Sequence, residues 1–200
     1  MHAVSLVGRR PGRRGFTLIE LLITIAVLGV ATILVIPSMS TTGVLRVQAA
    51  VRQIVADITF AQADAMAYQS RRALWFGRVP TTKDAPFSYD AGNGYVLAEV
   101  NGPALDLVTD AMFLPDRIDS PYARNFNEDQ YGGAIILNAS FDGDDLLIFD
   151  ELGGPVLDLT GPEPSDGGFV EIGTATSGGA WEYRINIAPM TGRVTVDRAE

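Results

Sequence analysis

Cysteine is absent from the 200-residue sequence, and histidine occurs once, at His2. Without cysteine the chain cannot form disulfides, so it gains no stability from an oxidising compartment, although it is compatible with one. Without a histidine after residue 2, the remainder of the chain cannot build a Ser-His-Asp or Cys-His catalytic group, or a zinc site that uses histidine.

Acidic residues are missing from residues 1–15, which contain four arginines, Arg9, Arg10, Arg13 and Arg14. The rest of the chain therefore carries 11 basic and 24 acidic side chains, a balance of −13. A domain of this charge is expected to avoid phosphate backbones, so we expect no nucleic acid among its partners. We also predict that residues 1–15 are a basic leader peptide that is cleaved.

Charge is almost absent from the next 21 residues, Phe16 to Ile36, where Glu20 is the single ionisable side chain. As a helix this run is about 30 Å long, enough to cross the hydrocarbon core of a bilayer. The arginines before it are typical of the cytoplasmic side. A carboxylate inside such a span costs about 2.5–3.5 kcal/mol on insertion scales, so Glu20 needs a cationic partner. One candidate is a new amino terminus at Phe16 on a neighbouring copy.

The junction between the leader and the apolar run reads Arg14-Gly15-Phe16-Thr17-Leu18-Ile19-Glu20. It resembles the processing site of type IV pilins and type II secretion pseudopilins. The resemblance implies that a prepilin peptidase cuts between Gly15 and Phe16, that Phe16 is then N-methylated, and that Glu20 guides assembly. Pro37 lies where this family often kinks its first helix.

Three other interpretations of the N-terminus are open. Arg13-Arg14 also resembles a twin-arginine export signal, although such signals have shorter apolar cores. Ser38-Met39-Ser40 fits the cleavage site of an ordinary signal peptide, but the apolar region of such a peptide is typically 7–15 residues long. A plain single-span anchor explains the length and the arginines and leaves Glu20 unexplained.

Helical spacing resumes after a weak joint at 38–43 and predicts a helix from about 44 to 70 that continues the apolar helix, with a bend near 37–43. Charged and polar residues, including Arg46, Arg52 and Asp57, fall largely off its apolar stripe. A sheet is the natural partner for this face. The stripe consists of Val44, Val47, Val51, Ile54, Val55, Ile58, Ala61 and Ala65.

Short β-like segments separated by Gly, Pro, Asn and Asp follow from Arg72. We predict strands at 73–76, 95–100, within 111–118, and at 134–138, 146–149, 156–159, 169–173 and 182–187, and a terminal hairpin that includes Val194 and Val196. Residues 80–94 and 161–168 read as loops, and 119–132 as irregular. The predicted fold class is α+β and pilin-like, with a long N-terminal helix packed on an antiparallel β-sheet domain.

Two C-terminal segments strengthen the resemblance. Residues 147–155, Leu-Ile-Phe-Asp-Glu-Leu-Gly-Gly-Pro, resemble a segment of the H class of minor pseudopilins (GspH), which is related to the pilin-like FimT. Residues 185–194, Ile-Asn-Ile-Ala-Pro-Met-Thr-Gly-Arg-Val, resemble its terminal hairpin. The resemblance is weak across about 80–145, where this chain is longer and more acidic than the class.

Few other groups of residues in the sequence could form a catalytic or metal site. Asp142-Gly143-Asp144-Asp145 offers carboxylates for calcium but lacks the full spacing of a calcium loop, so a solvated acidic turn is the preferred interpretation. Nothing selects a catalytic carboxylate pair among the acids. Trp75, Trp181 and Tyr183 are expected in the core or at its edge. We therefore predict no enzyme, no catalytic residues, no metal and no cofactor.

The sequence as a whole predicts a minor pseudopilin of a type II secretion system. Its expected organisation is a cleaved leader over 1–15, a transmembrane helix over 16–37 and a periplasmic globular domain over 38–200, held in the bacterial inner membrane. The expected partners are other pseudopilins or minor pilins, bound through the N-terminal helix, and a prepilin peptidase. Two other functions are open: a type IV pilus minor pilin involved in pilus assembly or DNA uptake, and an exported enzyme on an uncleaved anchor.

Overall fold

A single helix, α1 (Leu18–Tyr68), opens the described part of the chain and is followed almost entirely by strands. The computed structural model describes residues 16–82, 85–115, 117–128, 131–174 and 182–199, and describes no side chains for 32–44 and 118. The chain divides into two compact units, Met1–Thr41 and Thr42–Glu200. The helix is continuous across the predicted joint at 38–43.

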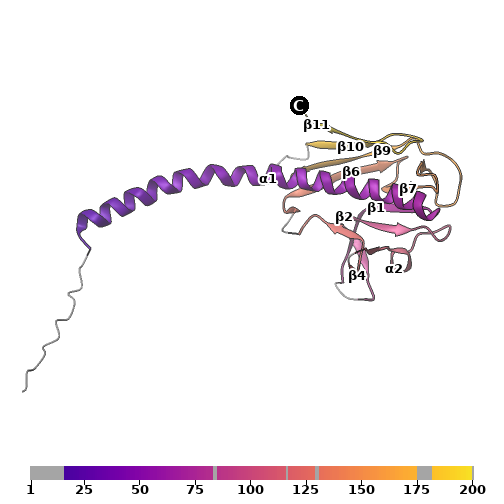
Figure 1. Cartoon of the computed structure of the whole chain (residues 1–200), viewed down its shortest axis with the longest axis horizontal. Helices are drawn as coiled ribbons and strands as arrows, with labels where there is room; N and C mark the ends of the chain where they lie inside the picture. The colour runs from indigo at the N-terminus through magenta and orange to yellow at the C-terminus, as the bar shows by residue number, and fades with distance from the viewer. Residues whose placement is uncertain (1–15, 83–84, 116, 129–130, 175–181, 200) are drawn as a thin grey trace, which may run out of the picture. The chain divides into compact units, whose positions relative to one another are not determined.

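Two antiparallel sheets form most of the second unit (Figure 1). The first has the order β5-β2-β1-β7-β8, with the strands β1 (Arg72–Pro80), β2 (Tyr89–Glu99), β5 (Ala123–Asn125), β7 (Leu146–Phe149) and β8 (Pro155–Val156). The second has the order β11-β10-β9-β6, with the strands β6 (Ala134–Phe141), β9 (Gly168–Thr174), β10 (Tyr183–Ile187) and β11 (Val194–Arg198). A small hairpin pairs β3 (Phe113–Leu114) with β4 (Arg117–Pro121).

The predicted apolar stripe of α1 makes the core. Ile54, Ile58 and Ala61 have no exposed surface and pack with buried residues of both sheets, such as Phe149 and Ile185. Burying a large aliphatic side chain contributes about 1.5–3 kcal/mol, so the stripe is the main attachment of the helix to the sheets. The α+β fold class, with a long N-terminal helix followed by antiparallel sheets, is confirmed.

Two glycine turns dock on one residue of α1. Gly153, in the β7–β8 turn, and Gly192, in the β10–β11 turn, have φ of +81° and +62°, a region that favours glycine. The side-chain amide of Gln62 donates to the carbonyls of Gly153 at 2.7 Å and Thr191 at 2.8 Å. A Cβ at Gly192 would lie 2.8 Å from a ring carbon of Phe149, so the turn has no room for a side chain. The two segments that resemble the H class are thus the turns that rest on α1.

Several sequence-based boundaries are wrong. The predicted loop 80–94 is shorter, because β2 begins at Tyr89 and pairs with the end of β1. The region predicted to be irregular, 119–132, contains the end of β4 and all of β5, and the candidate strand within 111–118 is divided between β3 and β4. A short helix, α2 (Leu107–Asp110), was not predicted. β5 is held by pairing with the distant strand β2, which a local pattern does not register, whereas β3 and β4 pair with each other and the Asp106 side chain caps α2.

Candidate functional site

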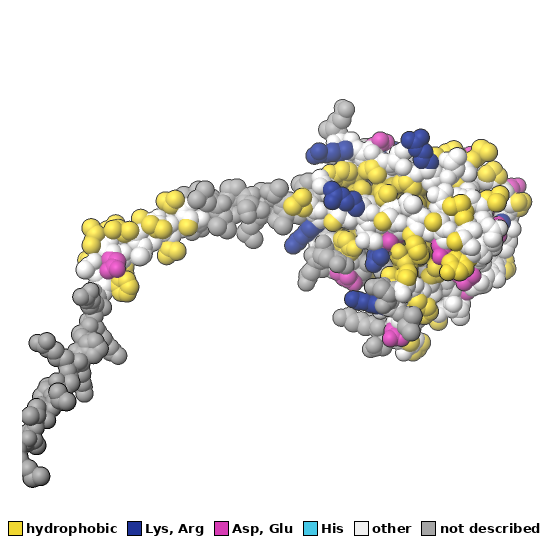
Figure 2. Space-filling model, viewed as in Figure 1, with side chains coloured by type: hydrophobic (Ala, Val, Ile, Leu, Met, Phe, Trp, Pro, Cys, Tyr) yellow, Lys and Arg dark blue, Asp and Glu magenta, His cyan; other side chains and the backbone are white. Residues whose placement is uncertain are grey.

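The N-terminal part of α1 is apolar and exposed on every side. All residues from 16 to 31 are exposed, and the large apolar ones expose between 55% and 83% of their surface. Figure 2 shows one face of this segment, where apolar side chains lie along the helix beside a single acidic side chain. Their number far exceeds the scattered exposed apolar residues of an ordinary surface, so this segment requires an apolar partner. The set is Phe16, Leu18, Ile19, Leu21, Leu22, Ile23, Ile25, Val27, Leu28 and Val30.

The predicted processing and assembly residues lie at the start of this helix. Gly15 lies outside the described residues, and Phe16 is 77% exposed. The backbone N–H of Glu20 donates to the Thr17 carbonyl at 3.1 Å and to the Thr17 hydroxyl at 3.3 Å, which makes Thr17 the cap of α1. Within the described part of the chain, which begins at Phe16, the Glu20 carboxylate forms no ion pair. The site thus presents an exposed carboxylate one turn into an exposed apolar helix.

Among the residues whose side chains the structure describes, no helix has the length and hydropathy required to cross a membrane.

A buried polar cluster, centred on Asp57, was missed in the sequence. The Asp57 carboxylate accepts hydrogen bonds from the phenols of Tyr95 at 2.6 Å and Tyr122 at 3.0 Å, from the Arg124 guanidinium at 2.8 Å and from the Gln53 amide at 2.8 Å. Asp57 is 3% exposed, against the expectation that it falls off the buried stripe. We call these five residues the Asp57 cluster. They join α1 to β2, β5 and the segment between β4 and β5.

The electrostatics of the Asp57 cluster follow from burial and from the Asp57 charge. Burial, and then the neighbouring Asp57 carboxylate, raise the pKa of Tyr95 well above its ordinary value and that of Tyr122 to about 12. Burial lowers the pKa of Arg124, but its hydrogen bond and attraction to Asp57 outweigh burial and leave that pKa raised. Both phenols are therefore neutral donors at physiological pH, and the guanidinium stays charged.

The geometry of the Asp57 cluster favours a structural role over a catalytic one. The carboxylate of Asp57 has four donors and almost no solvent access, so it has no free lone pair directed at a substrate. Burying a carboxylate is tolerable only where it is paired and hydrogen-bonded, as it is here. The Asp57 cluster therefore locks the orientation of α1 on the sheets. The one feature of the sequence that could have revealed this cluster is an acidic residue, Asp57, directly before Ile58 of the buried stripe.

The acidic turn proposed as a calcium candidate uses two of its three carboxylates in hydrogen bonds within the domain. Asp142 accepts hydrogen bonds from the Ser165 hydroxyl and the Asp166 N–H, and Asp145 accepts one from the Trp75 indole at 3.1 Å. Over the described residues, no group of three or more histidine, cysteine or acidic side chains is placed to hold a metal. The turn fastens β1 and the loop before β9 to each other.

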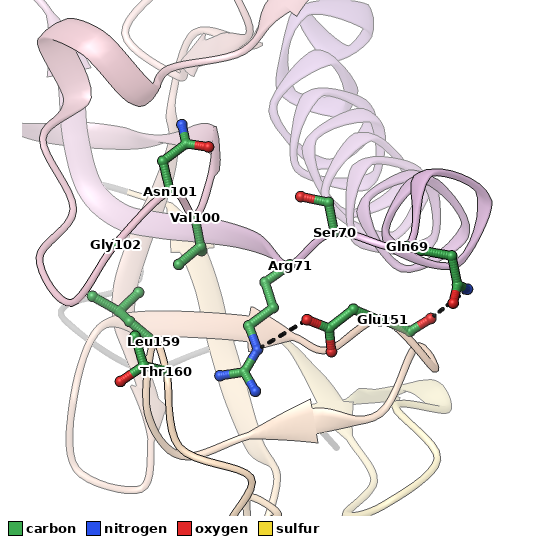
Figure 3. A pocket seen from close by; sticks show the side chains of 9 residues that line it. All are labelled: Gln69, Ser70, Arg71, Val100, Asn101, Gly102, Glu151, Leu159 and Thr160. Atoms are coloured by element: carbon green, nitrogen blue, oxygen red, sulfur yellow. Dashed lines mark hydrogen bonds and ion pairs between the residues drawn. The ribbon is translucent and has the colours of Figure 1, made fainter.

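The two consecutive arginines just after the end of α1, Arg71 and Arg72, are each paired with carboxylates. Arg72 is buried and forms ion pairs with Asp64 and Glu99, while Arg71 lies 3.5 Å from Glu151 and donates to the Asp158 carbonyl at 3.1 Å. Figure 3 shows the Arg71 guanidinium directed toward Glu151 at the edge of a polar pocket of about 360 Å³. Neighbouring carboxylates thus offset both charges.

Comparisons with known proteins bear on the N-terminus and on the fold. Residues 10–36 match the family model of the prokaryotic N-terminal methylation motif. Among solved structures, the chain is similar to the type IV minor pilin FimU of Pseudomonas aeruginosa, with 13% identity, 76% of this chain and 87% of that chain covered, and a TM-score of 0.41. No curated protein matches the chain. The motif spans the predicted junction at Gly15 and Phe16 and the exposed apolar helix.

Proposed function

We propose that this type IV pilin-like chain is a minor pseudopilin, a non-enzymatic structural subunit of the periplasmic pseudopilus of a type II secretion system. One observation carries the proposal: an N-terminal methylation motif leads into a helix whose apolar side chains are exposed all round, with one exposed carboxylate, Glu20. Such a segment is an assembly and anchoring device, because its surface is stable only against lipid or other apolar helices.

In this proposal the leader 1–15 stays on the cytoplasmic side and is removed by a prepilin peptidase between Gly15 and Phe16. Residues 16–37 hold the protein in the bacterial inner membrane as a single span, and residues 38–200 form the periplasmic domain. Other pseudopilins or minor pilins bind through the N-terminal helix. The Glu20 carboxylate pairs with the methylated amino terminus of a neighbouring subunit, which neutralises both charges in an apolar environment.

Processing is the most direct test of the proposal. Protein purified from membranes should have the intact mass of a chain that starts at Phe16 and carries one added methyl group. A Gly15→Val variant should keep the leader, because the branched side chain replaces the small residue at the cleavage position. A mature chain that starts near Thr41 would instead identify an ordinary signal peptide and contradict the proposal.

A second candidate function is a type IV pilus minor pilin that takes part in pilus assembly or DNA uptake, since the same N-terminal motif serves that role. DNA uptake requires cations available to phosphate, because phosphate neutralisation supplies most non-specific affinity. The periplasmic part, residues 38–200, carries 11 basic and 23 acidic side chains, a balance of −12, and carboxylates pair with both Arg71 and Arg72. This distribution favours secretion over DNA binding.

Titration with duplex DNA separates the two functions. Residues 42–200, produced alone, should show no salt-sensitive binding at micromolar protein and about 50 mM salt, where weak phosphate contacts are still measurable. Arg71→Ala with Arg78→Ala is the informative variant, because Arg72 is buried and its loss would destabilise the fold. Arg117→Ala is the control. Binding that disappears only in the double variant would favour DNA uptake.

A further inference from the structure

Three of the four edges of the two main sheets are blunted. β5 has three residues and β8 has two. The register of β6 is irregular between Ile136 and Asn138, and the Asn93 side chain bonds to the Ala134 carbonyl and the Ile136 N–H along it, both at 2.9 Å. Short edge strands, bulges and covering groups are the devices by which proteins prevent their edges from pairing with other chains.

The fourth edge, β11, has none of these three devices. It runs in regular register from Tyr183↔Arg198 to Ile187↔Val194, without a bulge, and is the outermost strand of its sheet (Figure 1). The backbones of Arg193 and Ala199, which flank it, bond to the β10 side. Antiparallel alternation therefore directs the N–H and C=O groups of Val194, Val196 and Arg198 away from β10. Within the described residues these outward groups have no hydrogen-bond partner.

On the face of β11 that is turned toward the core, one apolar side chain, Val196, is exposed. Val196 lies opposite Ile185, and Val194 lies opposite Ile187, and both isoleucines are buried in the core. Val196 itself is 43% exposed, because no strand lies beyond it. A strand added at this edge would place a side chain beside Val196, so an apolar residue there would extend the core layer by one strand.

Arg198 gives the β11 edge a positive side chain, which favours an acidic residue in an incoming strand. It shares the inner face with Val196, two residues earlier, and its guanidinium lies 6.0 Å from the ring centroid of Tyr183. It forms no ion pair with a carboxylate in the part of the chain that the structure describes. An incoming strand with an acidic residue two positions from the apolar one would match both side chains.

We propose that β11 is a docking edge for an extended segment of another subunit of the assembly. The segment pairs antiparallel with Val194–Arg198, carries an apolar side chain beside Val196 and an acidic one beside Arg198, and bonds to the outward N–H and C=O groups of this strand. The identification of the partner as another subunit rests on the proposed function, but the pairing chemistry does not. A second copy of β11 paired antiparallel about Val196 would place its Val194 beside Arg198 and would supply no acidic side chain there, so the proposed occupant is a different subunit.

A short peptide tests the pairing without requiring an assembled filament. The probe is the acetylated and amidated peptide Glu-Thr-Val-Thr-Val, which in antiparallel register places its Glu beside Arg198 and its valines beside Val196 and Val194. Amide hydrogen exchange is measured on the full-length protein in detergent, for the segment 193–199, at millimolar peptide. We expect exchange of the outward amides to slow by about tenfold or more, because they are open without the peptide.

Two matched variants distinguish pairing from an indirect effect. Val196→Pro removes an outward N–H and leaves the ladder to β10 intact, since proline is tolerated where the N–H faces away from the sheet. Thr195→Val changes a side chain on the opposite face of the strand, keeps the Val196 N–H and side chain, and is the control. We expect the peptide to protect the wild type and Thr195→Val, but not Val196→Pro, and a Lys-Thr-Val-Thr-Val peptide to protect less. Thermal unfolding of both variants verifies that each is folded.

Each result counts for or against the docking edge. If the peptide leaves exchange of segment 193–199 unchanged in the wild type, or protects Val196→Pro equally, the proposal is wrong. Protection that rises with protein concentration without peptide would show that a second copy is the occupant, and would overturn it too. Failure of cleavage at Gly15 and Phe16 would instead refute the proposed function and leave the peptide result interpretable.

Discussion

Replacing Glu20 by alanine should leave the chain cleaved and inserted but should remove most of it from the assembled filament. Insertion does not need the carboxylate, which costs about 2.5–3.5 kcal/mol inside an apolar span. Assembly loses the partner of a buried amino terminus, and leaving one member of a buried pair uncompensated costs about 3–5 kcal/mol. An energy of that size corresponds to a roughly 100-fold or greater loss in association constant.

The measurement compares the fraction of the subunit in sheared filaments with the fraction left in the membrane, together with secretion by the same cells. Thr24→Ala is the matched control. Thr24 is an exposed polar residue one turn further along α1, and among the described residues its hydroxyl donates to the Leu21 carbonyl within the helix. It should assemble as the wild type does. If Glu20→Ala also assembles at the wild-type level, the role proposed for Glu20 is wrong.

Replacing Asp57 by alanine should cost about 3–5 kcal/mol of unfolding free energy, because it removes the acceptor of a buried pair. Arg124, Tyr95 and Tyr122 would each keep a donor that no longer has its carboxylate. Domains of this kind are stable by about 5–15 kcal/mol, so the variant should be close to unfolding at physiological temperature. Urea unfolding of residues 42–200 measures the loss.

Two comparisons make this result specific. Asp158→Ala changes an exposed carboxylate and should stay within about 0.5 kcal/mol of the wild type. Tyr95→Phe removes one donor to a charged acceptor and should cost about 1.5–3 kcal/mol, less than the loss of Asp57 itself. A loss below about 1 kcal/mol for Asp57→Ala would mean that the Asp57 cluster does not fasten α1, and the apolar stripe alone would then do so.

The sequence by itself determined those features that depend on neighbours along the chain. The apolar run at 16–36 and the stripe through Ile54, Ile58 and Ala61 could be read directly, because a helix repeats its faces every 3.6 residues. The N-terminal motif is likewise local, since a peptidase recognises a short continuous segment. The terminal hairpin was also predicted correctly, because the residues around Gly192 are typical of a turn.

Tertiary structure alone decided which polar residues are buried. Asp57 was predicted to lie off the buried stripe, because an isolated carboxylate is too costly to bury. Its partners Tyr95, Tyr122 and Arg124 are 38, 65 and 67 residues away, so no local pattern connects them to it. Tertiary structure likewise decided that Arg71 and Arg72 are paired with carboxylates, from Glu151 for Arg71 and from Asp64 and Glu99 for Arg72.

The short strands and the position of β11 at an open sheet edge could not be predicted from the sequence either. β3, β5 and β8 have two or three residues each, too few to establish a period of alternation. They exist because the longer strands β4, β2 and β7 pair with them, respectively. Val194 and Val196 could be predicted as strand residues, but whether a strand lies in the middle of a sheet or at its edge depends on the order of pairing. That order is fixed by contacts between distant segments, and these form only when the whole chain packs.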